Sequence, residues 1–264
     1  MPGSDRTFVY KKTPQGELAM HVHMPKDWKP ADKRPAIVFF FGGGWTGGTV
    51  EQFRKQAEYF ASRGMVAARA DYRVKSVHGV TPDKCVADAK SAVRYLRANA
   101  AALGIDPDRI VASGGSAGGH IAACSGLSEG LEDEDPAVSS RPNAMVLFNP
   151  VAKLYGRAPL TAAMAHDPKL AKIISPCAHV KADSPPAIVF YGSEDKFYKV
   201  DGREFEKAAK QAGAKMAFSV YQGQNHGFFN HSPYMERTLI EADKFLAALG
   251  YLKGPPTITE PKGS

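Results

Sequence analysis

Short, continuously hydrophobic segments alternate along the chain with longer segments of helical periodicity. Unbroken hydrophobicity over a few residues is typical of strands that are buried on both faces, as the strands of a parallel sheet are. We therefore expect parallel strands at residues 35–41, 64–70, 109–113, 144–148, 187–191 and 217–221.

The N-terminal segments have a different pattern. Residues 7–11 and 17–24 alternate between hydrophobic and polar positions, and the turn-forming sequence at 13–16 separates them. Alternation predicts strands with only one buried face, so we expect an antiparallel hairpin at one edge of the sheet.

Helical patterns lie between and after the predicted strands. Hydrophobic residues spaced three and four apart over 86–103 predict a helix that ends at Gly104. Asp201 and Glu204 have the spacing of a capping box, and Gly213 would end the helix that they begin.

A last helix is predicted to start at residues 232–233, where serine precedes proline, and to end at Gly250. Regular alternation of strands and helices predicts an α/β protein with helices on both sides of a mostly parallel sheet.

Two longer segments interrupt this alternation. Residues 129–143 are acidic and rich in turn formers. A calcium loop is one interpretation, but the alternating ligands and central glycine are missing, which favours a solvated loop. Residues 150–186 exceed an ordinary connection and include a predicted helix near 160–173. We expect this insertion to be a small cap on a single domain that spans residues 1–264.

The composition narrows the classes of protein. Of 264 residues, 44% are hydrophobic, which suffices for one sizeable core. The net charge of +7 comes from basic residues scattered among acidic ones, so we expect no nucleic-acid binding.

The sequence lacks a membrane-span pattern and a signal-peptide pattern, which fits a cytoplasmic protein or one exported with its signal removed. Three cysteines at 85, 124 and 177 are too dispersed for a zinc site or disulfide scaffold and are expected to be small buried residues.

The candidate chemistry begins with Gly114-Gly-Ser-Ala-Gly118, which directly follows a predicted strand and precedes a helical run of small residues. A serine on a tight strand-to-helix turn has a strained backbone, so its neighbours must lack bulky side chains. This context is that of a nucleophile elbow, with Ser116 at a helix N-terminus. The alternative is a glycine-rich turn with an ordinary N-cap serine.

A serine nucleophile needs a base and an acid, which in this arrangement follow it after later strands. Asp195 and His226 each lie in a loop directly after a predicted strand, and we interpret them as the acid and the base. Glu194 and His231 compete for these roles. We expect Glu194 to be solvated, and His231 adjoins a predicted helix start.

The sequence Phe41-Gly-Gly-Gly-Trp45 follows the first central strand. Successive glycines let the main chain approach a substrate and present N–H groups to a reacting oxygen. We assign the oxyanion hole to the N–H groups of Gly43, Gly44 and Ala117. A phosphate-binding loop is the alternative, but no Lys-Ser/Thr pair follows the glycines, which argues against a Walker-type site.

These motifs together resemble α/β-hydrolases of the esterase branch that includes hormone-sensitive-lipase-like esterases and bacterial acetylxylan and feruloyl esterases. The resemblance implies an α/β-hydrolase fold, with a mostly parallel sheet of about eight strands, helices on both faces and a small cap. The matching segments occur in the family's order at residues 42–45, 71–73, 104–109, 114–119, 192–195 and 225–228.

One departure from the family pattern is Phe41, which stands where a histidine usually precedes the three glycines. Because the expected oxyanion donors are backbone groups, we expect activity to survive this difference. We interpret Asp71-Tyr-Arg73 as structural, with an ion pair and a phenol that brace the oxyanion loop.

The expected activity is hydrolysis of short-chain acyl esters through a Ser-His-Asp triad and an acyl-enzyme, with no metal or organic cofactor. The resemblance implies acetyl or feruloyl esters of carbohydrate as substrates. Lysines in the predicted cap argue against a long-chain lipase. Candidate pocket walls are the aromatic residues Trp45, Tyr155, Phe197 and Phe228.

Two alternatives remain open at this stage. A serine peptidase of the same fold would share the triad, although such peptidases usually carry an extra domain. A non-catalytic ligand-binding protein on this scaffold would be expected to lack the triad histidine, whereas His226 is present. The sequence gives no indication of the oligomeric state.

Overall fold

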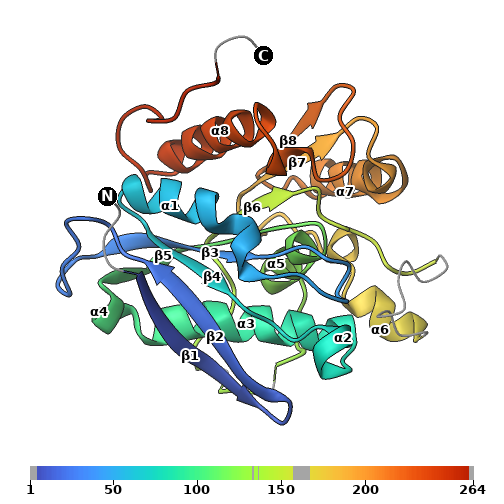
Figure 1. The fold of residues 1–264 in the computed structure, drawn as a ribbon. Coiled ribbons are helices and arrows are strands. Elements are labelled where there is room, and N and C mark those ends of the chain that lie inside the picture. The colour runs from blue at the N-terminus through green and yellow to red at the C-terminus, as the bar shows by residue number, and fades with distance from the viewer. Residues whose placement is uncertain (1–4, 133, 136, 157–166, 262–264) are drawn as a thin grey trace.

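A computed structural model describes residues 5–132, 134–135, 137–156 and 167–261. Its eight-stranded sheet has the order β1-β2-β4-β3-β5-β6-β7-β8, and it is parallel from β4 to β8 (Figure 1). The α/β-hydrolase fold predicted from the sequence is therefore confirmed. The strands are β1 (Asp5–Thr13), β2 (Gly16–His23), β3 (Arg34–Phe40), β4 (Val66–Ala70), β5 (Ile105–Gly115), β6 (Ala144–Phe148), β7 (Ala187–Gly192) and β8 (Met216–Tyr221).

The N-terminal hairpin forms the edge of the sheet, as its alternating pattern predicts. Strand β1 pairs antiparallel with β2, and β2 in turn pairs antiparallel with β4. The half-buried pattern of β1 follows from its edge position, whereas the central strands β4 and β6 are buried along their whole length.

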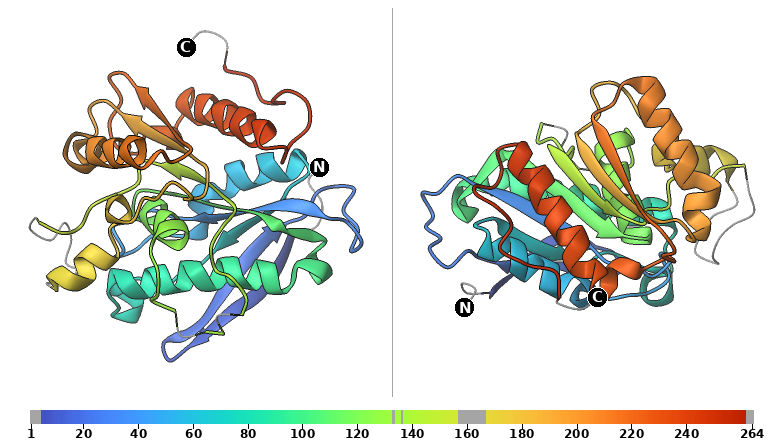
Figure 2. Two further views of the ribbon diagram at one scale, coloured as in Figure 1. Left: turned by 180° about the vertical axis from the view of Figure 1, so that it is seen from behind. Right: turned by 90° about the horizontal axis from the view of Figure 1, so that it is seen from above.

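Helices cover both faces of the sheet (Figure 2). Helices α1 (Arg54–Ser62) and α8 (Tyr234–Ala248) pack on one face. Helices α3 (Pro82–Ala98), α5 (Ala117–Leu127) and α7 (Arg203–Ala212) pack on the other. The shorter helical elements are α2 (Lys75–His78), α4 (Ala100–Leu103), α6 (Pro168–Ile173), η1 (Val50–Phe53), η2 (Pro176–Ala178), η3 (Tyr198–Gly202) and η4 (Phe228–Asn230).

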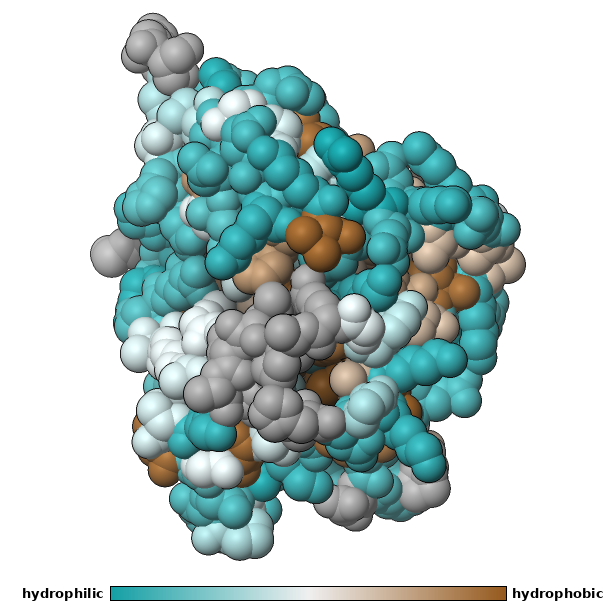
Figure 3. All heavy atoms as spheres, turned by 90° about the vertical axis from the view of Figure 1, so that its right-hand side faces the viewer, coloured by the Kyte–Doolittle hydropathy of each residue, from teal (hydrophilic) through white to brown (hydrophobic). Residues whose placement is uncertain are grey.

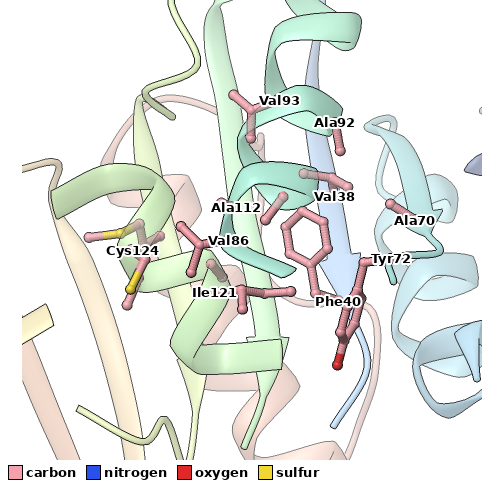
Figure 4. Packing of buried hydrophobic residues seen from close by; sticks show 14 of the residues in the cluster. Val38, Phe40, Ala70, Tyr72, Val86, Ala92, Val93, Ala112, Ile121 and Cys124 are labelled. Carbon is pink, nitrogen blue, oxygen red and sulfur yellow. The ribbon is translucent and has the colours of Figure 1, made fainter. Parts of the chain in front are cut away.

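Alternate residues of each central strand divide the core into two layers. In β3, Val38 and Phe40 face the layer that contains α3 and α5, where they lie near Val86, Val93 and Ile121 (Figure 4). Ile37 and Phe39, which alternate with them in the strand, belong to the layer on the opposite face. Both layers are needed to bury a strand that is hydrophobic at every position.

The helix predicted over 86–103 is divided in two in the structure. Helix α3 ends at Asn99, and the single turn α4 then ends at Gly104, as expected. Gly104 has a φ of 62°, and a Cβ there would lie 2.7 Å from the Trp28 indole nitrogen. Both the left-handed backbone and the close packing require glycine.

The predicted capping box at Asp201 and Glu204 is wrong. Asp201 is buried in η3, and its carboxylate accepts hydrogen bonds from the N–H groups of Ala152 and Lys153, at 2.8 and 3.1 Å. The Asp201 carboxylate therefore binds a distant loop, and it does not cap the helix as its spacing from Glu204 predicted. Asp201 lies within η3, which runs directly into α7 at Arg203, and α7 ends at Gly213 as expected.

The structure describes the two long segments in part, and the described part of the acidic segment is an irregular loop, as expected. Within the acidic segment, the Glu132 carboxylate accepts hydrogen bonds from Lys90, Arg94 and Ser140, so α3 holds it by charge pairing. In the insertion, α6 and η2 form the described part. The first half of the helix predicted near 160–173 lies outside the described residues, and its second half contains α6. The role of this insertion as a cap stays a prediction.

The three cysteines are free thiols, with Cys85 and Cys124 buried and Cys177 half-buried. Burial raises the pKa of Cys124 to about 12 and that of Cys177 to about 11, which disfavours the reactive thiolate. No helix in the described ranges is both long and apolar enough to cross a bilayer. Those same ranges contain no group of three or more metal-ligating side chains.

Candidate active site

Ser116 lies on the turn between β5 and α5, at the carboxyl end of a central strand. Its φ and ψ are 55° and −118°, a conformation that costs a non-glycine residue about 1–3 kcal/mol. The turn also packs closely against β3, because a Cβ at Gly118 would lie 2.0 Å from the Phe40 carbonyl oxygen. The main chain is anchored by the Ser116 N–H, which donates to the Phe148 carbonyl at 2.9 Å. This is the geometry of an elbow that presents a serine hydroxyl.

His226 and Asp195 meet Ser116 although they come from loops after different strands. The distance from His226 Nε2 to Ser116 Oγ is 2.8 Å, and that from His226 Nδ1 to Asp195 Oδ2 is also 2.8 Å. The carboxylate accepts from Nδ1–H, so the tautomer leaves Nε2 free to accept the hydroxyl proton. Of the competitors, Glu194 is exposed and pairs with Lys199, and His231 is exposed.

The Asp195 carboxylate is buried, with 1% of the residue exposed, and it has two further donors. The Phe197 N–H donates to Oδ1 and the Asn149 side chain donates to Oδ2, both at 2.8 Å. Asn149 has a φ of 44° at the end of β6, and the sequence reasoning missed it. Its position directly after a buried strand is the signal that could have identified it.

The glycine loop after β3 lies against Ser116. Gly43 and Gly44 have φ values of 133° and 61°, and a Cβ at Gly43 would lie 2.0 Å from the Gly47 carbonyl oxygen. Both glycines and Ser116 line a cavity of about 530 Å³. Ala117 follows the serine as the first residue of α5. Two of the predicted oxyanion residues therefore line the same cavity as Ser116, and the third follows Ser116 in the chain. Their action on a substrate oxygen stays a prediction.

Comparison with known proteins shows the family of the chain and supports its fold. The profile of the BD-FAE family matches residues 20–166, which is more than half of the chain. The chain belongs to the BD-FAE family. The solved structure of Thermogutta terrifontis esterase 2 phosphonylated by sarin has a TM-score of 0.89 and 45% sequence identity, over 95% of this chain and 96% of that one.

Curated relatives of this BD-FAE protein are also esterases. Esterase LipQ of Mycobacterium tuberculosis is 27% identical, over 100% of this chain and 70% of its own length. The isoprenylcysteine alpha-carbonyl methylesterase ICME of Arabidopsis thaliana is 27% identical, and the chain covers only 56% of that protein. Fold, family and relatives identify the chain as a carboxylic ester hydrolase of the α/β-hydrolase type.

The BD-FAE chain supports its glycine loop without the family's usual histidine. Phe41 is buried and stacks on Tyr72, with ring centroids 4.2 Å apart, and the Tyr72 hydroxyl donates to the Phe41 carbonyl at 2.7 Å. Arg73 forms its ion pair with Asp88 of α3, at 2.8 Å, and not with Asp71. The Tyr72 phenol therefore braces the glycine loop, as expected. The ion pair of this segment joins it to α3 and not to its own Asp71.

Two of the four predicted pocket walls lie in the core instead. Trp45 is 1% exposed, and its φ of 59° turns the ring toward α5, where its indole N–H donates to His120 Nδ1 at 3.1 Å. Phe228 is 7% exposed and packs against Tyr221 and Tyr234. The sequence could not show which side of its loop each ring occupies.

The other two aromatic residues are half-buried. Phe197 contacts His226 edge-on, with ring centroids 4.7 Å apart, so it limits the movement of the imidazole. The Lys153 ammonium lies 5.0 Å from the centroid of the Tyr155 ring. Neither Phe197 nor Tyr155 is among the residues that line the cavity.

The cavity beside Ser116 has small and polar walls that the sequence reasoning did not anticipate. Glycines form much of its surface, and Phe229 is its one aromatic residue among those described. The amide side chains of Gln52 and Asn230 were missed because they come from segments far apart in the sequence. The lining consists of Gly42, Gly43, Gly44, Gly48, Thr49, Gln52, Ser116, His226, Gly227, Phe229 and Asn230.

Proposed function

We propose that the BD-FAE chain hydrolyses short-chain carboxylic esters through an acyl-enzyme on Ser116. The observation that carries this proposal is the continuous pair of 2.8 Å contacts from Ser116 Oγ through His226 to Asp195. A serine hydroxyl becomes an effective nucleophile when a positioned base can take its proton, and these distances are within hydrogen-bond reach.

In the proposed reaction, Ser116 Oγ attacks the ester carbonyl carbon while His226 Nε2 takes the hydroxyl proton. Asp195 holds the imidazole and stabilises its protonated form. The N–H groups of Gly43, Gly44 and Ala117 stabilise the tetrahedral oxyanion. His226 then protonates the leaving alcohol. Water, deprotonated by the same histidine, attacks the acyl-enzyme, and Ser116 recovers its proton as the acid product leaves.

Several observations support a short acyl group. The cavity is about 530 Å³, with glycine, hydroxyl and amide groups on its walls. On the face at the carboxyl ends of the strands, most of the visible described residues are hydrophilic, with hydrophobic residues between them (Figure 3). Solved structures of Thermogutta terrifontis esterase 2 include propionate-bound and butyrate-bound forms. Within the carbohydrate esters that we consider, an acetyl group suits this cavity better than a feruloyl group, which would need aromatic walls.

The test of the nucleophile is the Ser116→Ala variant, which we expect to lose turnover of an activated acetyl ester because no other hydroxyl replaces Oγ. Paraoxon should inactivate the wild type and add a diethylphosphoryl group to the peptide that contains Ser116, as mass spectrometry would detect. Ser62→Ala, on the exposed side of α1, is the matched control. Turnover that persists in Ser116→Ala, or an adduct on another residue, would refute the proposed nucleophile.

The substrate proposal is tested with nitrophenyl esters from acetyl to dodecanoyl, together with acetylated xylan, a feruloyl ester and an aminoacyl amide. We expect kcat/KM to be highest between acetyl and butyryl and to fall for longer chains. Release of acetate from xylan would support a carbohydrate ester as the substrate. Faster hydrolysis of the dodecanoyl ester would contradict the short-acyl proposal, and faster cleavage of the amide would favour a peptidase.

A further inference from the structure

Two amide side chains form a bridge across the cavity beside Ser116. Gln52 comes from η1, before α1, and Asn230 comes from η4, 178 residues later in the sequence. Gln52 Nε2 donates to Asn230 Oδ1 at 3.1 Å. Both side chains are half-buried and line the cavity. We call this pair the amide bridge.

Each end of the amide bridge binds a backbone group of a different loop. The Gly42 N–H donates to Gln52 Oε1 at 2.6 Å. Asn230 Nδ2 donates to the Gly227 carbonyl at 2.9 Å. A backbone N–H can only donate and a carbonyl can only accept, so the two ends determine the orientation of both amides. The three hydrogen bonds therefore run in one direction from the glycine loop to the histidine loop.

The two loops that the amide bridge joins carry the proposed reacting groups. Gly42 directly precedes the proposed oxyanion donor Gly43, and Gly227 directly follows His226. A further contact extends this chain of hydrogen bonds. The Gly227 nitrogen lies 3.4 Å from Oδ1 of Asn149, the residue that donates to the Asp195 carboxylate. A run of glycines has little side-chain packing to hold it, so external hydrogen bonds must restrict its many backbone conformations.

We propose that Gln52 is a positioning residue that, through Asn230, holds the oxyanion loop at the correct distance from His226. This inference rests on the proposed function of Ser116, His226 and the glycine loop. Because the Gly42 N–H is occupied by Gln52, Gly42 is not a donor to substrate. The amide bridge should therefore affect the stability of the transition state and not the binding of the substrate, because the oxyanion forms only after the serine attacks.

The test compares the near-isosteric variants Gln52→Met and Asn230→Leu with the wild type on a nitrophenyl acetate substrate. We expect kcat to fall by roughly 10- to 100-fold in each, as misplacement of reacting groups by about 1 Å does, while KM changes by less than about twofold. The affinity for a trifluoromethyl ketone, which forms an oxyanion on Ser116, should fall by the same factor as kcat. A merely structural role would not link inhibitor affinity to kcat in this way.

The double variant distinguishes a shared bridge from two independent effects. If Gln52 and Asn230 act as one unit, Gln52→Met/Asn230→Leu should lose no more activity than the more severe single variant, whereas independent effects would multiply. Gln52→Glu is a second probe, since its carboxylate can accept from Gly42 but cannot donate to Asn230. It should remain impaired, and it serves in place of Gln52→Met if that variant does not fold in a thermal-unfolding measurement.

Gln56→Met is the matched control, because Gln56 is a buried amide on the following helix α1 whose Oε1 has no hydrogen-bond partner within the described residues. Its kcat should equal that of the wild type. Unchanged kcat in folded Gln52 variants, or a rise in KM alone, would overturn the bridge. Activity retained in Ser116→Ala would instead overturn the proposed function, so the two failures are distinguishable.

Discussion

Ser116 and Asn149 both have a positive φ at adjacent strand ends. Their φ values are 55° and 44°, in the region where side chains other than glycine are strained. Each conformation directs a polar side chain into the site: one presents the hydroxyl, and the other donates to the Asp195 carboxylate. At both positions a backbone hydrogen bond to the neighbouring strand end anchors the residue, from the Ser116 N–H to Phe148 and from the Asn149 N–H to Phe190.

For Asn149 we expect a loss of both activity and stability on substitution by alanine. The buried Asp195 carboxylate would lose one of its hydrogen bonds, which costs about 2 kcal/mol of unfolding free energy. A less restrained carboxylate would also misorient His226, lowering kcat by roughly 10- to 100-fold. Urea unfolding and steady-state kinetics measure the two effects. Asn99→Ala, at the end of α3, is the control for activity, and wild-type kcat in Asn149→Ala would contradict this role.

At the scale of the elements, His120 of α5 connects the oxyanion loop to the insertion. Its Nδ1 accepts from the Trp45 indole, and its Nε2 lies 2.6 Å from the Ile174 carbonyl. Since a carbonyl only accepts, Nε2 carries the proton and the ring is neutral. Complete burial lowers the pKa of His120 to about 4, because desolvation disfavours the imidazolium more than the hydrogen bond to the Ile174 carbonyl favours it.

The low pKa of His120 predicts a pH dependence of stability. Its folded pKa of about 4 is below the unfolded value near 6.5, so the unfolded state binds more protons between these values. Its contribution is complete above pH 6.5 and is lost as the pH falls toward 4, by on the order of 3 kcal/mol. In urea unfolding, His120→Gln should therefore lose less stability than the wild type across this window.

Exposed His231→Gln is the control for that measurement and should follow the wild-type slope. Parallel curves for the wild type and His120→Gln between pH 6.5 and 4 would show that His120 does not have the lowered pKa.

Predictions of individual elements were accurate where the local sequence determined the structure, and they failed where a contact with a distant segment determined it. The strand segments were identified because burial on both faces requires hydrophobic residues at every position. The helix end at Gly104 follows from a backbone conformation that favours glycine. The capping box failed because Asp201 uses its carboxylate to bind a distant loop. Trp45 was placed in the pocket because a sequence does not show into which layer a loop residue turns.

At the scale of the whole molecule, the parallel sheet explains why the proposed reacting groups converge. The carboxyl ends of β5, β7 and β8 lie at the same edge, and β5 is central while β7 and β8 are neighbours toward one side. Loops from these strands can therefore meet above a single turn. The order of serine, acid and base along the chain follows from this topology, and it allowed the sequence to predict all three.

The sequence by itself determined the fold class, the strand positions and the candidates Ser116, Asp195 and His226, because these depend on local hydrophobic patterns, on glycine spacing and on strand-end position. Only the tertiary structure decided that Asn149 donates a hydrogen bond to Asp195, that Trp45 is buried, and that two amides 178 residues apart in the sequence meet across the cavity. Those features depend on the directions of side chains from segments far apart in sequence. A hydrogen bond between such segments produces no hydrophobic periodicity or motif in either sequence, so the sequence does not predict it.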